Sequence, residues 1–84
     1  MSYAVDWDDD ALFTLAAIWI GASDRQAVTV AQATIDRVLA SNPVGNGTPV
    51  GEGLYAFEVP PLRVLFEVCD PIRSVRVVSV GELV

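Results

Sequence analysis

The sequence contains no histidine, no lysine and a single cysteine, Cys69. Without histidine, the chain cannot form a Ser–His or Cys–His nucleophile pair, a histidine-ligated zinc site or a histidine general base. A single cysteine excludes an internal disulfide and any multi-cysteine metal site, and it is consistent with a reducing cytoplasm. Cys69 has only Asp70 beside it and no basic neighbour, so we predict that it is an unreactive small residue.

Basic residues are also scarce. Five arginines are the only basic residues, against eleven aspartates and glutamates, and the net charge is −6. This charge repels phosphates, which disfavours general nucleic-acid binding and anionic membrane surfaces.

The chain has 84 residues, of which 52% are hydrophobic, and this predicts one globular domain spanning residues 1–84. A domain of this size buries only about 60–65% of the surface of its unfolded chain and can depend on a partner for stability. We expect a cytoplasmic location, because four aspartates in the first ten residues are unlike a signal peptide. The longest apolar run, residues 11–22, is also too short for a membrane span, which needs about 20 residues.

The first third of the chain predicts a strand and a helix. Tyr3, Val5 and Trp7 alternate with other residues, as in a short strand with one buried face. Asp8 is predicted to cap the following helix with its side chain, and Gly21 to end it in a left-handed conformation. The predicted core stripe of this helix comprises Ala11, Leu12, Leu15, Ile18, Trp19 and Ala22.

A second helix follows at once. Ser23 and Gln26 match a capping box, and Asn42-Pro43 marks the end of the helix. Its predicted core stripe comprises Val28, Ala31, Ile35, Val38 and Leu39. Two helices joined by two or three residues form an antiparallel hairpin.

The rest of the chain predicts a loop and three strands. Residues 44–53 contain four glycines and read as a flexible loop; a phosphate-binding loop is disfavoured because no lysine is present and a strand follows. Residues 54–59, 62–69 and 72–80 alternate with period two, and Asp70 to Arg73 suit a type I turn. The predicted fold is α+β, in the order β-α-α-β-β-β, with the helical hairpin on one face of an antiparallel sheet.

The turn at residues 70–73 fixes a register in which the large apolar residues share one face. The predicted inward pairs are Val68–Val75, Phe66–Val77, Val64–Ser79, Phe57–Val64 and Tyr55–Phe66. The opposite face, here termed the open face, places Glu58 opposite Arg63 and Glu67 opposite Arg76. Between these pairs the register predicts an apolar strip of Leu54, Ala56, Leu65, Val78 and Val80.

Several residues are candidate functional groups. Arg63 and Arg76 are candidate phosphate contacts, but a glutamate opposite each favours a cross-strand ion pair. The aspartates at positions 6, 8, 9 and 10 favour helix capping over a metal site, and we expect no metal and no cofactor. Trp7 and Trp19 are predicted to pack in the core rather than to stack on a ligand.

The order of these elements resembles the RelE/ParE toxin superfamily of bacterial type II toxin–antitoxin (plasmid stabilisation) modules. The resemblance covers nearly the whole chain, and its most specific part is the strand from Leu62 to Val68 followed by a turn and a valine-rich strand. The matching stretches are Trp7 to Trp19, Ala31 to Pro43, Gly53 to Tyr55, Pro61 to Val68, and Val75 to Gly81.

The resemblance implies an open sheet face that, in RelE-like members, cleaves mRNA on the ribosome with several Arg and Lys residues and a terminal Tyr or His. Arg63 matches the arginine of the family's middle strand, whereas Ala56 and Glu58 occupy the positions of its lysines. After Gly81 the family continues with basic residues and a tyrosine, and this chain has Glu82-Leu83-Val84. Most of the residues that the family uses for RNA cleavage are therefore absent. ParE-like members act on DNA gyrase rather than on RNA, so their function is compatible with that absence.

Three functions remain open from the sequence. The first is a toxin-like protein with little or no nuclease activity that acts by protein–protein contact and binds an antitoxin; its target would be the ribosome with mRNA, or DNA gyrase. The second is an active mRNA interferase that uses Arg63 and Arg76 as catalytic residues. The third is a structural module that self-associates, for example as a homodimer, through the apolar strip of the open face. The predicted binding residues are Leu54, Ala56, Glu58, Leu65, Glu67, Val78 and Val80.

Overall fold

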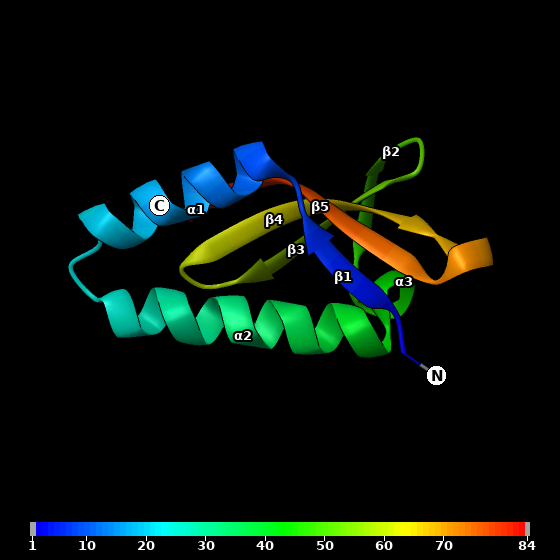
Figure 1. The fold of residues 1–84 in the computed structure, drawn as a ribbon, viewed down its shortest axis with the longest axis horizontal. Helices are drawn as coiled ribbons and strands as arrows, with labels where there is room; N and C mark the ends of the chain where they lie inside the picture. Colours follow the sequence, from blue (N-terminus) through cyan, green and yellow to red (C-terminus); the bar gives the residue numbers. More distant parts are fainter. Residues whose placement is uncertain (1, 84) are drawn as a thin grey trace.

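The computed structural model describes residues 2–83 and shows two long helices against a five-stranded sheet (Figure 1). The elements in chain order are β1 (Ala4–Trp7), α1 (Asp9–Gly21), α2 (Arg25–Ser41), α3 (Pro43–Asn46), β2 (Thr48–Gly51), β3 (Leu54–Val59), β4 (Leu62–Cys69), a 3-10 turn (Asp70–Ile72) and β5 (Ser74–Glu82). The strand order is β1-β5-β4-β3-β2; β1 runs parallel to β5, and the other neighbours are antiparallel. The predicted α+β architecture is confirmed, with a mixed sheet and one extra strand.

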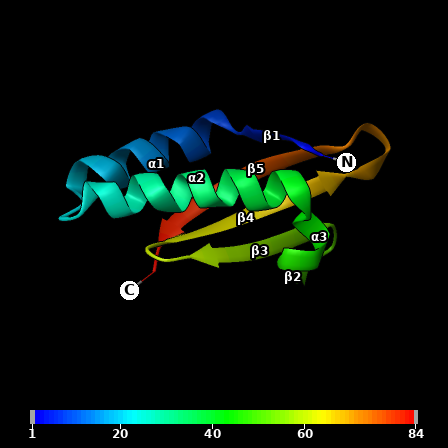
Figure 2. The same cartoon turned by 90° about the horizontal axis from the view of Figure 1, so that it is seen from below.

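Helices α1 and α2 form an antiparallel hairpin on one side of the sheet (Figure 2). Their predicted stripes are buried at Ala11, Leu15 and Ile18 in α1, and at Val28, Ala31, Ile35 and Leu39 in α2. These side chains pack against the inward residues of the two central strands, which are Leu62, Val64, Phe66, Val75, Val77 and Val80. Within residues 2–83, no helix combines the length and the apolar character that crossing a membrane requires.

The helix ends differ from the prediction. Asp24, not Ser23, caps α2, because its side chain accepts a hydrogen bond from the backbone N–H of Ala27 at 3.1 Å. Gly21 is helical rather than left-handed, and the chain leaves α1 through an extended Ala22. The Arg25 guanidinium donates to the last carbonyl groups of α1 (3.1 and 2.9 Å), so no left-handed glycine is needed to satisfy them.

The two tryptophans have different environments. Trp7 packs against the core as predicted, and its Nε1 donates to Asp36 Oδ1 at 2.8 Å. Trp19 was predicted in the core but is 42% exposed. Its Nε1 donates to Thr29 Oγ1 at 3.2 Å, and the Arg25 guanidinium lies 4.8 Å from its ring centroid. The indole N–H thus keeps a polar partner at the α1–α2 seam.

The predicted loop at residues 44–53 is wrong in part, since it holds α3 and β2. Asn42 caps the N-terminus of α3, and its side chain accepts a hydrogen bond from the N–H of Gly45 at 3.1 Å. Strand β2 then pairs with β3 along one sheet edge. Gly47 joins the two elements and lies so close to Phe66 that a Cβ atom there would be 2.7 Å from the ring. Only glycine allows this close approach.

The strand register is confirmed except near the end of β5. All β3–β4 pairs are as predicted, and the β4–β5 pairs agree as far as Phe66 opposite Val77. A β-bulge then inserts Val78, so Val64 faces Val80 rather than Ser79. Val80 therefore lies in the core, only 6% exposed, and its predicted position on the open face is wrong.

Candidate functional site

The side of the sheet facing away from the helices carries the open face predicted from the register. Leu54, Leu65 and Val78 are half-buried there and do not belong to the core cluster. Ala56 is buried but also lies outside that cluster. Because Val80 lies in the core, the apolar strip consists of these four residues rather than the five predicted.

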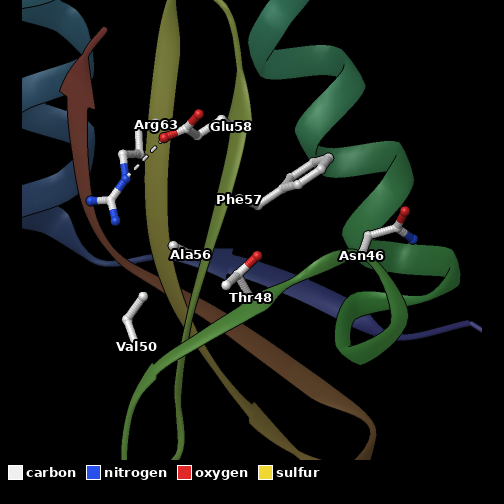
Figure 3. A pocket seen from close by; sticks show the side chains of 7 residues that line it. All are labelled: Asn46, Thr48, Val50, Ala56, Phe57, Glu58 and Arg63. Atoms are coloured by element: carbon white, nitrogen blue, oxygen red, sulfur yellow. Dashed lines mark ion pairs between the residues drawn. The ribbon is translucent and has the colours of Figure 1, made fainter.

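Arg63 pairs with Glu58 as predicted. Its Nε lies 3.3 Å from Glu58 Oε2, and both side chains are about half exposed (42% and 55%). The pair borders a shallow hollow of about 290 Å³ that is also lined by Asn46 at the end of α3 and by Thr48 and Val50 in the edge strand β2. Figure 3 shows the ion pair across the hollow from Thr48, while Phe57 points toward α2. The hollow is small and open, and its cation already has a counter-charge.

Arg76 has a different partner from the one predicted. Glu67 is directly opposite on β4, but the ion pair joins Arg76 Nε to Asp8 Oδ1 at 3.0 Å. The parallel pairing of β1 with β5 causes this, because it sets Asp6 opposite Arg76 and brings the next acid, Asp8, within reach. The Asp8 side chain consequently makes no capping hydrogen bond with α1, and that part of the prediction is wrong.

The surroundings of Arg76 are acidic. A hollow of about 480 Å³ beside it is lined by Asp6, Glu52 and Glu67. Carboxylates therefore outnumber the guanidinium group around Arg76, whereas Glu58 alone balances Arg63. A surface of this sign favours basic partners over phosphates.

The two arginines do not converge on one site. Arg63 and Arg76 border separate hollows. Glu67, the residue opposite Arg76, is four positions beyond Arg63 on β4, which corresponds to about 13 Å along the strand. Cleavage of a phosphodiester needs preorganised cations around one group, together with an acid or base. The described residues instead hold each guanidinium against a carboxylate.

A third arginine lies at the turn before β5. Arg73 has φ of 51°, and its guanidinium lies 5.8 Å from the centroid of the Tyr3 ring. Tyr3 Oη donates to Asp70 Oδ1 at 2.8 Å. This hydrogen bond, with some burial and the negative charge of Asp70, raises the pKa of Tyr3, although Arg73 opposes the shift.

Other candidates from the sequence contribute little. Cys69 is exposed and unpaired. Across residues 2–83, no three His, Cys, Asp or Glu side chains gather in a way that could hold a metal ion.

The sequence prediction missed four residues of this face. Asn46, Thr48 and Val50 line the Arg63 hollow, and they were missed because α3 and β2 were predicted to be a loop. The alternation of Thr48 and Val50 was the one sequence signal of β2. Asp8 was assigned to the helix, since the parallel position of β1 beside β5 was not foreseen.

Comparison with known proteins finds the same fold in RelE toxins. A chain of the RelBE2 toxin–antitoxin complex from Mycobacterium tuberculosis has a TM-score of 0.81 at 16% identity, covering 99% of this chain and 100% of that chain. A variant of the Escherichia coli toxin RelE in the free state has a TM-score of 0.71 at 22% identity, covering 98% of this chain and 84% of that one. The archaeal RelE–RelB complex from Pyrococcus horikoshii gives 0.70 at 16% identity, with 98% and 96% covered. No protein-family model and no curated protein sequence matches the chain.

Proposed function

We propose that this protein is the toxin-like component of a bacterial type II toxin–antitoxin module and acts in the cytoplasm by protein–protein contact, with little or no nuclease activity. The likeness to RelE folds over nearly the full chain supports the first part. The observation that carries the second part is the pairing of each open-face arginine with a carboxylate, Arg63 with Glu58 and Arg76 with Asp8.

The proposed partner is a cognate antitoxin. Similar structures are described as complexes of RelE with RelB, or as RelBE toxin–antitoxin complexes. The apolar strip, flanked by Glu58 and Glu67, suits a partner segment with apolar side chains and a few basic ones. The proposed binding residues are Leu54, Ala56, Glu58, Leu65, Glu67 and Val78.

Controlled expression in bacteria tests this function. The chain alone is expected to slow growth, and co-expression with the reading frame adjacent to its gene is expected to restore it. Cellular mRNA, mapped by primer extension, is expected to stay intact during the arrest. Growth arrest should persist in an Arg63→Ala variant, because the proposed mechanism does not use this cation.

An active mRNA interferase is the competing function, since Arg63 matches the arginine of the RelE-like middle strand. Cleavage of mRNA on induction, lost in the Arg63→Ala variant, would establish that function and refute ours. Normal growth under all conditions would refute the toxin assignment itself. In an arrest without mRNA cleavage, DNA gyrase is the target to assay next, by supercoiling of plasmid DNA.

A further inference from the structure

Both asparagines of the chain lie at helix α3. Asn42 caps the helix and is followed by Pro43, whereas Asn46 ends the helix and is followed by Gly47. Asparagine is a chemically labile residue type, because its side-chain amide can be attacked by the backbone nitrogen of the next residue. A following glycine allows the closest approach of that nitrogen, since it has no Cβ atom. Proline has no N–H to lose, so Asn42 cannot react in this way.

The surroundings of Asn46 expose the side chain to water but engage both reacting groups. Asn46 is exposed and lines the Arg63 hollow at the junction of α3 and β2 (Figure 3). Its Nδ2 donates to the carbonyl oxygen of Asn42 at 2.8 Å, and the N–H of Gly47 donates to that of Pro43 at 3.0 Å. Helix α3 is a single turn of four residues, and such a turn opens more readily than a long helix.

We propose that Asn46 is a self-modification site, at which the backbone nitrogen of Gly47 attacks the side-chain amide carbon when the α3 turn opens. A bond forms between Gly47 N and Asn46 Cγ, the Cγ–Nδ2 bond breaks, and the amide nitrogen leaves as ammonia. The proton lost by the Gly47 nitrogen passes to solvent, and the departing ammonia takes a proton from solvent. The step closes a succinimide ring within one chain, so it needs neither an enzyme nor an oxidant.

Water then opens the succinimide ring in one of two ways. Addition at the former side-chain carbonyl gives an aspartate with a normal backbone at position 46. Addition at the main-chain carbonyl gives an isoaspartate, in which the backbone runs through the side chain and is longer by one methylene group. Either product adds one carboxylate, which changes the net charge from −6 to −7 and places the new charge at the Arg63 hollow.

The isoaspartate form does not fit the packing of the folded chain. A Cβ atom on Gly47 would already lie 2.7 Å from the Phe66 ring and 3.0 Å from Tyr55 Cβ. A longer backbone at this point has to displace Gly47, which leads directly into β2. The isoaspartate form is therefore expected to lose the pairing of Thr48 with Ala56, whereas the aspartate form keeps it. None of these steps depends on whether the protein is a toxin.

Peptide mapping by mass spectrometry of the full chain, aged at fixed pH and temperature, tests the reaction. Conversion is expected at Asn46 and not at Asn42, which is an internal control. The same chain unfolded in guanidinium chloride should react about 30-fold faster, equivalent to about 2 kcal/mol for the two hydrogen bonds that opening breaks. Asn46 that stays intact in the folded chain for the time in which this ratio predicts conversion would overturn the proposal. Equal conversion at both asparagines would also overturn it.

Two variants of the cap test whether α3 controls the rate. Asn42→Ala removes the side chain that accepts from the N–H of Gly45. It should speed the reaction of the folded chain about fivefold, equivalent to about 1 kcal/mol for a lost cap. Asn42→Asp is the matched control, because it keeps an acceptor oxygen, and it should react at the wild-type rate. Circular dichroism confirms that each variant is folded. Equal rates in all three proteins, or in the folded and unfolded chain, would overturn control by α3.

Hydrogen exchange distinguishes the two products. Asn46→Asp supplies the aspartate product with a normal backbone, so the amides of β2 and β3 should keep their protection in this variant. An aged sample should lose that protection in proportion to its isoaspartate content, which an isoaspartate-specific methyltransferase measures. Equal protection in the aged sample and in Asn46→Asp would overturn the predicted loss of β2.

Discussion

Freeing the two open-face arginines should create a phosphate-binding surface. We consider the double variant Glu58→Gln with Asp8→Asn, which removes the counter-charges of Arg63 and Arg76 but keeps the shapes of the side chains. Two unit charges 3.3 Å apart attract by about 1.3 kcal/mol at the dielectric constant of water. Exposed pairs of this kind contribute about 0.2–1 kcal/mol once side-chain entropy and screening are included.

That energy is what a phosphate has to overcome at each arginine. At 1 kcal/mol, the loss of the competing carboxylate should strengthen binding of an RNA oligonucleotide about fivefold per arginine, and up to about 25-fold for both. Two additional phosphate contacts should also steepen the dependence of log K on log salt by about 1.4 for single strands. Fluorescence anisotropy with a labelled single-stranded RNA, from about 50 to 200 mM salt, measures both quantities.

The matched control separates local pairing from net charge. Asp9→Asn with Asp10→Asn also changes the net charge from −6 to −4, because each variant removes two carboxylates, but these residues make no ion pair with either open-face arginine. The control should gain little affinity and keep its salt slope. If it matches the double variant, or if the wild type already binds RNA as tightly, then the ion pairs do not suppress phosphate binding and the reasoning is refuted.

Three further predictions concern stability and titration. In urea unfolding, Gly47→Ala should lower the free energy of unfolding by about 1–3 kcal/mol, because the new Cβ meets a buried aromatic ring. Gly21→Ala should raise the free energy of unfolding by up to about 1 kcal/mol, because the new Cβ meets nothing within 4 Å. Asp36→Ala should lower it by about 1.5–3 kcal/mol through loss of the charged acceptor of the β1 indole, and equal stability of Asp36→Ala and Asp36→Asn would contradict this. Because folding raises the pKa of Tyr3, the protonated phenol stabilises the folded state. This stabilisation is complete below the unfolded pKa and is lost as pH rises through the folded pKa. In a titration followed by phenolate absorbance, one tyrosine should ionise at a higher pH than the other, and Asp70→Ala should lower the pKa of Tyr3.

The parts of the fold that follow from local rules were predictable from the sequence. The helical spacing of Val28, Ala31, Ile35 and Leu39 determines which side of α2 is buried. The β3–β4 register follows from side-chain alternation across a tight turn, because a slip of one residue would turn every large side chain to the wrong face.

The parts that failed depend on tertiary contacts. Val78 differs in no local property from its neighbours, so the sequence could not reveal that it forms the bulge that sends Val80 inward. Asp8 is a residue type typical of helix caps. Only the position of β1 beside β5 brings its carboxylate within ion-pairing distance of Arg76. The glycines and the proline in and around β2 indicated a loop. The strand forms because β2 pairs with β3, and not because its residues have a high strand propensity.

The parallel pairing of β1 with β5 also governs when the sheet can be completed. Residues 4–7 find their partner in residues 74–77, which are synthesised 70 positions later. Until then, a chain growing from its N-terminus can form the α1–α2 hairpin but cannot cover the apolar stripe that the hairpin turns toward β4 and β5. Closure of the core is thus postponed until translation of this segment is nearly over, and the half-made protein presents Leu15, Ile35 and Leu39 to whatever binds emerging chains at the ribosome.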